Sequence, residues 1–253
     1  MNENNLVVSP CSNPEMTLDE ALSAYSEIGY TKFEAFTGWA KSSLDIEGDP
    51  EEYAKKAASY GMRFTSMHLA QIAENVDASL AYAIKGARFA AKLGASVVLF
   101  KAKTTELFAE AGPQFLDAID GLGITPVLQN HKGTAITTLD DFRAVIEGIN
   151  DARMKTLLES GMFHAVGTHW REGCDLLGDS IALVHVKDMV GAQSVPFGTG
   201  EMDIRGLYRH LRTMDYTGGI VIEMEVTDSE NTIEYLADAR KYMIEIMQSE
   251  DTV

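Results

Sequence analysis

The side chains of this sequence that could do chemistry stand at the ends of short apolar runs. Carboxylates clustered at such positions repel one another unless a cation compensates their charge. A mixed set of carboxylate and imidazole ligands suits a divalent ion such as Mn²⁺, Mg²⁺, Co²⁺ or Zn²⁺. We therefore predict a site for one divalent metal ion. The residues that close the apolar runs are, in chain order, Glu34, His68, Lys101, Gln129 with His131, Glu159, His185 with Lys187, and Glu223 with Glu225.

The basic members of this set have two explanations each. Lys101, Lys187 and His131 could supply protons or hold substrate hydroxyl groups. A salt bridge to a rim carboxylate explains Lys187 equally well. Glu223, which ends the last apolar run, is a residue that can bind a metal.

A smaller group of residues is expected to form the substrate pocket. Glu34 and His68 would line it, and Trp39 closely follows the run that contains Glu34. An indole ring at this position could stack on the apolar face of a sugar. Gly198 and Gly200 follow His185 in sequence and suit a loop that closes over a substrate.

Apolar runs alternate with amphipathic segments along the whole chain. The segment Val76–Leu93 is an alanine-rich helix, and a later helix is expected over Met162–Leu177. Eight strand–helix pairs predict right-handed crossovers and a parallel sheet. Their number and total length fit a single α/β domain over residues 1–253, a closed (β/α)8 TIM barrel, with its site at the carboxyl ends of the strands. The alternative is a doubly wound sheet, but residues 9–13 lack its glycine-rich phosphate turn.

The composition excludes several classes of protein. The chain has 253 residues and a net charge of −17, without the basic footprint of a nucleic-acid binder. No apolar run approaches the roughly 20 residues that cross a membrane, and no signal-peptide pattern opens the chain. A cytoplasmic location is therefore expected. Cys11 and Cys174 lie far apart in sequence and are expected to be reduced thiols.

Three motifs of the second half are characteristic of one superfamily. Their matching residues are Val184–Asp188 for Val-His-x-Lys-Asp, then Gly198, Gly200 and Asp203 for Gly-x-Gly-x-x-Asp, and finally Tyr216, Gly218 and Glu223 for Tyr-x-Gly and a strand that ends in Glu. Over nearly its full length the chain resembles the xylose isomerase-like barrel superfamily, in its branch of sugar (phosphate) isomerases and epimerases.

The resemblance implies that one metal ion is held by residues of strands five to eight. The corresponding residues are Gln129, Glu159, His185 and Glu223. Two of them depart from the superfamily pattern, because Glu159 stands where Asp is usual and Gln129 stands where Glu is usual. An amide oxygen can still bind a metal, but an amide cannot accept a proton as a carboxylate does.

These departures bear on the reaction. In epimerases of this superfamily, the carboxylates of strands five and eight transfer protons on opposite faces of the substrate. Here only Glu223 remains of the two, so it is the best candidate for a catalytic base. The superfamily also often has a substrate-binding histidine three residues after the strand-six ligand. Met162 takes that position, and His164 either replaces the histidine or packs within its helix.

Three functions remain open at this stage, each with a small sugar-like partner. The first is a metal-dependent isomerase or epimerase that abstracts a proton next to a carbonyl and passes through an enediolate. The second is a lyase or dehydratase acting on a keto-sugar or cyclitol, which needs a single Glu base. The third is a barrel that binds a sugar without turning it over. The resemblance also makes a homo-oligomer possible, without specifying one.

Overall fold

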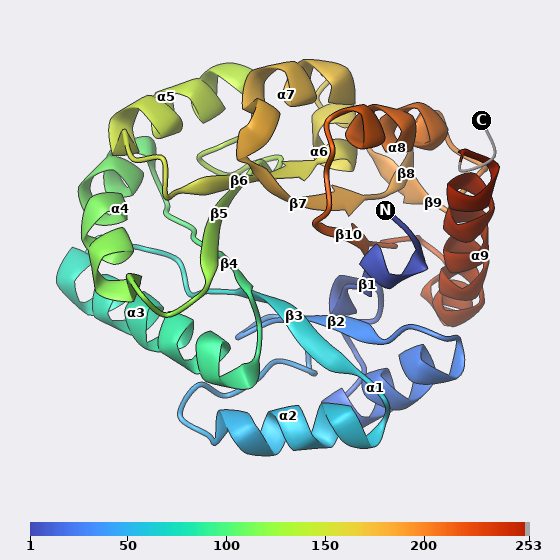
Figure 1. Cartoon of the computed structure of the whole chain (residues 1–253), viewed down its shortest axis with the longest axis horizontal. Helices are drawn as coiled ribbons and strands as arrows, with labels where there is room; N and C mark the ends of the chain where they lie inside the picture. Colours follow the sequence, from blue (N-terminus) through green and yellow to red (C-terminus); the bar gives the residue numbers. More distant parts are fainter. Residues whose placement is uncertain (251–253) are drawn as a thin grey trace.

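The computed structural model describes residues 1–250 and shows eight parallel strands closed into a barrel, with helices packed around it (Figure 1). Around the barrel the strand order is β1-β10-β7-β6-β5-β4-β3-β2, which confirms the predicted TIM barrel. The barrel strands are β1 (Leu6–Val8), β2 (Lys32–Ala35), β3 (Arg63–His68), β4 (Val97–Leu99), β5 (Thr125–Gln129), β6 (Lys155–Glu159), β7 (Ile181–Val186) and β10 (Gly219–Ile222).

Helices follow the strands and cover the outside of the barrel. They are α1 (Leu18–Glu27), α2 (Pro50–Ser59), α3 (Val76–Leu93), α4 (Thr105–Ile119), α5 (Leu139–Ile149), α6 (Ser160–His164), α7 (Trp170–Leu177), α8 (Ile204–Thr213) and α9 (Thr232–Glu250). Short 3₁₀ turns also occur at Glu3–Asn5, Pro10–Ser12, Gly178–Ser180 and Ser229–Asn231. No helix in residues 1–250 is both long and apolar enough to cross a membrane.

The single helix expected over Met162–Leu177 is wrong. The chain forms α6 and α7 instead, and Gly167 between them adopts a positive φ of 79°. Glycine reaches this conformation without the steric cost of a side chain, so it ends one helix and turns the chain into the next. Both cysteines, Cys11 and Cys174, are buried free thiols as expected.

The interior of the barrel is filled by a small apolar cluster. Its six buried members each come from a different strand, namely Val7, Leu99, Val127, Leu157, Leu183 and Val221. Side chains of a strand alternate between its two faces, so a residue two positions later points to the same side. The chain positions two residues beyond five of these side chains are occupied by Lys101, Gln129, Glu159, His185 and Glu223. The alternation that fills the barrel thus also aims the candidate site residues inward at its carboxyl end.

A short antiparallel hairpin, β8 (Asp188–Val190) and β9 (Gln193–Val195), lies between β7 and α8 and was not expected from the sequence. Asp188 anchors the following loop, because its buried carboxylate accepts hydrogen bonds from four backbone N–H groups. The donors are Met189 (3.0 Å), Gly198 (2.8 Å), Gly200 (2.9 Å) and Met202 (3.3 Å). A Cβ on Gly200 would lie 2.1 Å from the Asp188 carboxylate, so the loop can close around it only with glycine there.

We expect Asp188→Ala to destabilise the protein by about 3 kcal/mol or more, because several buried N–H donors lose a charged acceptor at once. Asp140→Ala is the matched control, since Asp140 is exposed and pairs with Arg143, three residues later. Such a surface pair contributes about 1 kcal/mol at most. Urea unfolding measures both variants, and equal losses would show that Asp188 does not anchor the loop.

Candidate functional site

A cavity of about 650 Å³ opens beside the carboxyl ends of the barrel strands. Its walls hold both acidic and basic groups together with aromatic rings. The lining residues with polar or ionisable side chains are Thr37, His68, Gln71, Lys101, Gln129, His131, Thr134, Lys187, Glu223 and Glu225, and Cys11, Phe36 and Trp39 complete much of the remaining wall. The cavity is large enough for a ligand of sugar size.

His185 lies at the centre of the buried charges beside this cavity. Its Nδ1 atom is 3.0 Å from Glu159 Oε2 and 3.1 Å from Glu223 Oε1, and its Nε2 atom is 3.2 Å from Glu34 Oε1. The side chains of His185, Glu34 and Glu159 are fully buried. Three carboxylates from three strands therefore share one imidazole, and two of them meet it at the same nitrogen.

This arrangement fits a divalent metal ion between Glu159, His185 and Glu223. Adjacent ligands at right angles around an ion lie about 3 Å apart when each ligand is about 2.1 Å away, which matches the observed separations from Nδ1. The Oε1 atom of Glu159 is buried and has no hydrogen-bond partner among the described residues. A buried carboxylate oxygen of this kind is costly unless a cation compensates it.

Gln129, the fourth expected ligand, lies beside the same group. Its amide Nε2 donates a hydrogen bond of 3.3 Å to Glu159 Oε2. The backbone of Glu159 is held as well, because the side chain of Asn130 donates to its carbonyl oxygen and accepts from its N–H, both at 3.0 Å. Asn130 was not among the expected site residues, although it follows Gln129 directly. All four expected ligands thus gather at one point.

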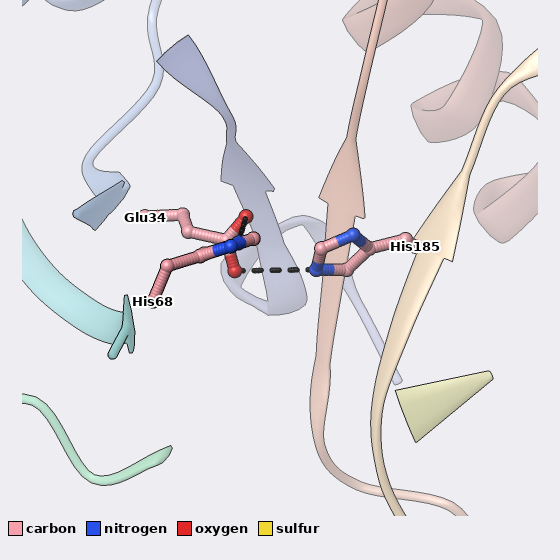
Figure 2. Close-up of side chains that lie close together, drawn as sticks. All are labelled: Glu34, His68 and His185. Carbon is pink, nitrogen blue, oxygen red and sulfur yellow. Dashed lines mark hydrogen bonds and ion pairs between the residues drawn. The ribbon is translucent and has the colours of Figure 1, made fainter. Parts of the chain in front are cut away.

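Glu34 bridges the two histidines of the site (Figure 2). Its second oxygen, Oε2, lies 3.2 Å from His68 Nε2, while Ser66 donates a 2.8 Å hydrogen bond to Oε1. Carboxylates commonly orient a metal-binding histidine in this way. Ser66 precedes His68 by two residues on β3, so strand alternation was the signal that could have identified it.

His68 carries this chain of contacts into the cavity. Lys101 Nζ lies 3.4 Å from His68 Nδ1. An ammonium can only donate, so Nδ1 accepts the hydrogen bond, and the proton of a neutral His68 resides on Nε2, facing Glu34. One N–H of Lys101 is thereby directed at the ring of His68.

Lys187 forms salt bridges, which was one of the two roles expected for it. Its ammonium lies 3.0 Å from Glu223 Oε2 and also pairs with Glu225. Only 2% of the Lys187 side chain is exposed, whereas 38% of Glu225 is. Gly161 makes room for Lys187, since a Cβ there would lie 3.0 Å from the Lys187 side chain. Lys187 therefore holds Glu223 from the side opposite to His185.

The pKa values of Glu223 and Glu159 are shifted in opposite directions. Burial disfavours ionised Glu223, but Lys187 and His185 outweigh it and hold the pKa of Glu223 well below its ordinary value. Burial and the neighbouring charge of Glu223 instead raise the pKa of Glu159. Burial also disfavours charged His185, yet Glu34 and Glu223 hold its pKa well above the ordinary value. The cluster therefore attracts positive charge, as a metal site must.

The remaining expected residues lie in two places. Trp39 and His131 line the cavity, with 68% of Trp39 exposed and the His131 Nδ1 atom 3.1 Å from the carbonyl oxygen of Lys132. Trp39 also has a positive φ of 77°, a strained conformation for a residue with a side chain. His164 is not among the residues that line the cavity and instead contacts Glu201, with 3.3 Å between Nε2 and a carboxylate oxygen.

The sequence model of the xylose isomerase-like TIM barrel family matches residues 22–246. The chain belongs to this family. An inosose dehydratase from Halalkalibacterium halodurans is 27% identical to this family member over 150 residues, which make up 51% of the chain and 49% of that relative. The match thus spans about half the length of the relative.

Solved structures of the same fold cover nearly the whole chain. A xylose isomerase-like TIM barrel protein from Mycobacterium smegmatis in complex with magnesium has a TM-score of 0.78 and 18% identity, covering 98% of this chain and 99% of its own. A D-tagatose 3-epimerase-like protein has a TM-score of 0.76 and 14% identity, with 98% and 100% covered. At these identities the likeness confirms the fold.

The acid sensitivity of the protein should depend on His68. Burial lowers the pKa of His68 to about 4, although Glu34 opposes this shift, whereas an unfolded histidine has a pKa of about 6.5. The unfolded state then binds the proton more tightly, so the stability that neutral His68 contributes is lost as the pH falls from about 6.5 through 4. Between pH 7 and 4.5, we expect the free energy of unfolding of His68→Gln to fall by about 2 kcal/mol less than that of the wild type.

Urea unfolding at several pH values measures this difference. His210→Gln, on α8 and outside the cavity, is the control and should follow the wild type. Parallel curves for the wild type and His68→Gln would contradict the assignment of this proton to His68.

Proposed function

We propose that this protein is a metal-dependent dehydratase that removes water from a keto-sugar or a cyclitol ketone. The observation that carries the proposal is that Gln129 lines the cavity at the position where a second carboxylate base would stand. Elimination needs one base, because only one C–H proton has to be removed. The half-length resemblance to an inosose dehydratase supports the same choice.

Glu223 is the base of the proposed reaction. Lys187 and His185 keep its pKa low, so it is a carboxylate at neutral pH and can accept a proton. It takes the proton from the carbon next to the substrate carbonyl, and the electron pair of that C–H bond passes toward the carbonyl oxygen. The electron pair then returns to form a C=C bond between that carbon and the next, the carbonyl is restored, and the C–O bond at the next carbon breaks, so that its hydroxyl leaves with a proton as water.

His131 is the proposed donor of that second proton. It lines the cavity, and its Nδ1–H donates to the Lys132 carbonyl, so Nε2 is left for the substrate and gives up the proton that it carries when His131 is an imidazolium. Trp39 offers an exposed ring for the apolar face of the substrate. The overall change is the loss of one water molecule, without oxidation or reduction.

Glu159, His185, Glu223 and the Gln129 amide oxygen are the proposed metal ligands. A bound divalent ion would supply a Lewis acid that withdraws electrons from the substrate carbonyl. Glu34 fixes the ring of His185 through Nε2, which leaves Nδ1 for the ion.

Epimerisation is the second candidate function. Lys101 on the β4 side lies opposite β10 in the strand order, with three strands between them in either direction. A proton donor there could return a proton to the second face of the substrate. Lys101 would then take the role of the carboxylate that Gln129 replaces. A D-tagatose 3-epimerase-like protein also shares the fold.

We expect Glu223→Gln to lower the rate by about 100-fold or more, because an amide cannot serve as the base. Keto-sugars and inososes are incubated in D₂O, and NMR follows both deuterium incorporation and loss of water. Glu110→Gln, an exposed change on α4, should keep full activity. Elimination products support the dehydratase, exchange with inverted product identifies the epimerase, and no exchange with any compound would leave a barrel that only binds sugars.

Metal binding is tested separately on the purified protein. Elemental analysis should find about one divalent ion per chain, and added Mn²⁺ should raise the melting temperature. Glu159→Gln should abolish most of that increase, since the buried oxygen without a partner is lost as an anionic ligand. Glu110→Gln should respond as the wild type does. A wild-type protein that holds no metal and gains no stability from Mn²⁺ would contradict the metal site.

A further inference from the structure

Lys101 is a cavity-lining cation without a carboxylate of its own. No carboxylate of residues 1–249 lies within salt-bridge distance of its ammonium, and its hydrogen bond goes to the ring of His68. Lys187, the other lysine of the cavity, has two carboxylate partners. A charged group that is largely removed from water normally has a counter-ion. The counter-ion of Lys101 is therefore expected to arrive with the ligand.

The cavity is divided by charge. Its carboxylates, Glu223 and Glu225, both follow β10 and are already paired with Lys187. The wall supplied by β3, β4 and β5 contains no carboxylate among the cavity residues. It presents Lys101 with uncharged or weakly basic groups, namely His68, Gln71, Gln129, His131 and Thr134. A chain with a net charge of −17 thus keeps one wall of its cavity free of acidic side chains.

We propose that the substrate carries a carboxylate group and that Lys101 binds it. The proposal rests on the proposed function, since it names the class of keto-sugar derivative on which that site acts. One ammonium balances the single charge of a carboxylate. Gln71, His131 and Thr134 line the same wall and could donate hydrogen bonds to its oxygens. A phosphate monoester carries nearly two charges at neutral pH, and this wall offers one lysine to meet them.

The position of Lys101 also suits the reaction geometry. Because β4 lies opposite β10, a carboxylate held by Lys101 places the remainder of the substrate across the barrel toward Glu223. His68 accepts a hydrogen bond from the ammonium, and Glu34 lies 3.2 Å from the other ring nitrogen of His68. The side chain is thus oriented before the ligand binds, which reduces the entropy lost on binding.

Binding of matched probes tests this assignment without turnover. D-Gluconate and D-glucitol have the same carbon chain, but only the first carries a carboxylate. Calorimetric titration of the wild-type protein should give at least about 10-fold tighter binding of D-gluconate, a difference of about 1.4 kcal/mol. Lys101→Gln should abolish this preference, chiefly by weakening the binding of D-gluconate. Lys101→Arg, which retains the charge, should keep most of the preference.

Lys103→Gln is the matched control, because Lys103 lies two residues away, is about half exposed and pairs with Glu74. It should bind both probes as the wild type does. Equal wild-type affinity for both probes would overturn the proposal, whether or not the variants fold. So would a preference for D-gluconate that survives Lys101→Gln.

A third probe, D-glucitol 6-phosphate, separates the two kinds of anion. Binding that is tighter than that of D-gluconate and depends on Lys101 would replace the carboxylate with a phosphate. Failure of the proposed function appears instead as absent deuterium exchange, which leaves probe binding unaffected. The reverse result, exchange with neutral sugars and no preference for D-gluconate, would overturn only the assignment of Lys101.

Discussion

The electrostatic compensation of buried carboxylates is the constraint on which this structure depends. Glu34, Glu159 and Glu223 are all nearly or fully removed from water, and each contacts the imidazole of His185. Without positive charge at that point, the three side chains could not share the space and remain ionised. Lys187 supplies part of the compensation, and the unpaired oxygen of Glu159 leaves room for more.

The barrel satisfies this constraint through the alternation of its strands. An inner layer of aliphatic side chains fills the space between the strands, and the next inward-pointing position on each strand carries a polar group. Five of these polar groups come from five consecutive strands of the barrel, β10, β7, β6, β5 and β4. Their convergence therefore follows from the register of the sheet and does not require a specially shaped loop.

Much of this arrangement could be predicted from the sequence, because it depends on local periodicity. The apolar runs predicted the strands, and the residues that end those runs predicted the site. Contacts between distant segments could not be predicted in the same way. The sequence suggested a salt bridge for Lys187. Nothing in it indicated that Glu34 contacts both His68 and His185, or that Lys101 pairs with no carboxylate among residues 1–249.

Other differences have local physical causes. Gly167 divided one expected helix into two, because the tertiary structure uses its positive φ for a turn. The hairpin of β8 and β9 was too short to give a recognisable pattern of alternation. His164 had two explanations at the sequence level, and its orientation toward Glu201 depends on how α6 packs against the loop that follows β9.

The aliphatic layer determines the side from which small molecules enter and leave the cavity. The barrel interior is filled by Val7, Leu99, Val127, Leu157, Leu183 and Val221, so the cavity does not continue through the barrel to the amino ends of the strands. A small molecule therefore enters and leaves on the side of the carboxyl ends. Under the proposed dehydration, both the released water and the organic product would leave on this side, where the exposed Trp39 lines the cavity.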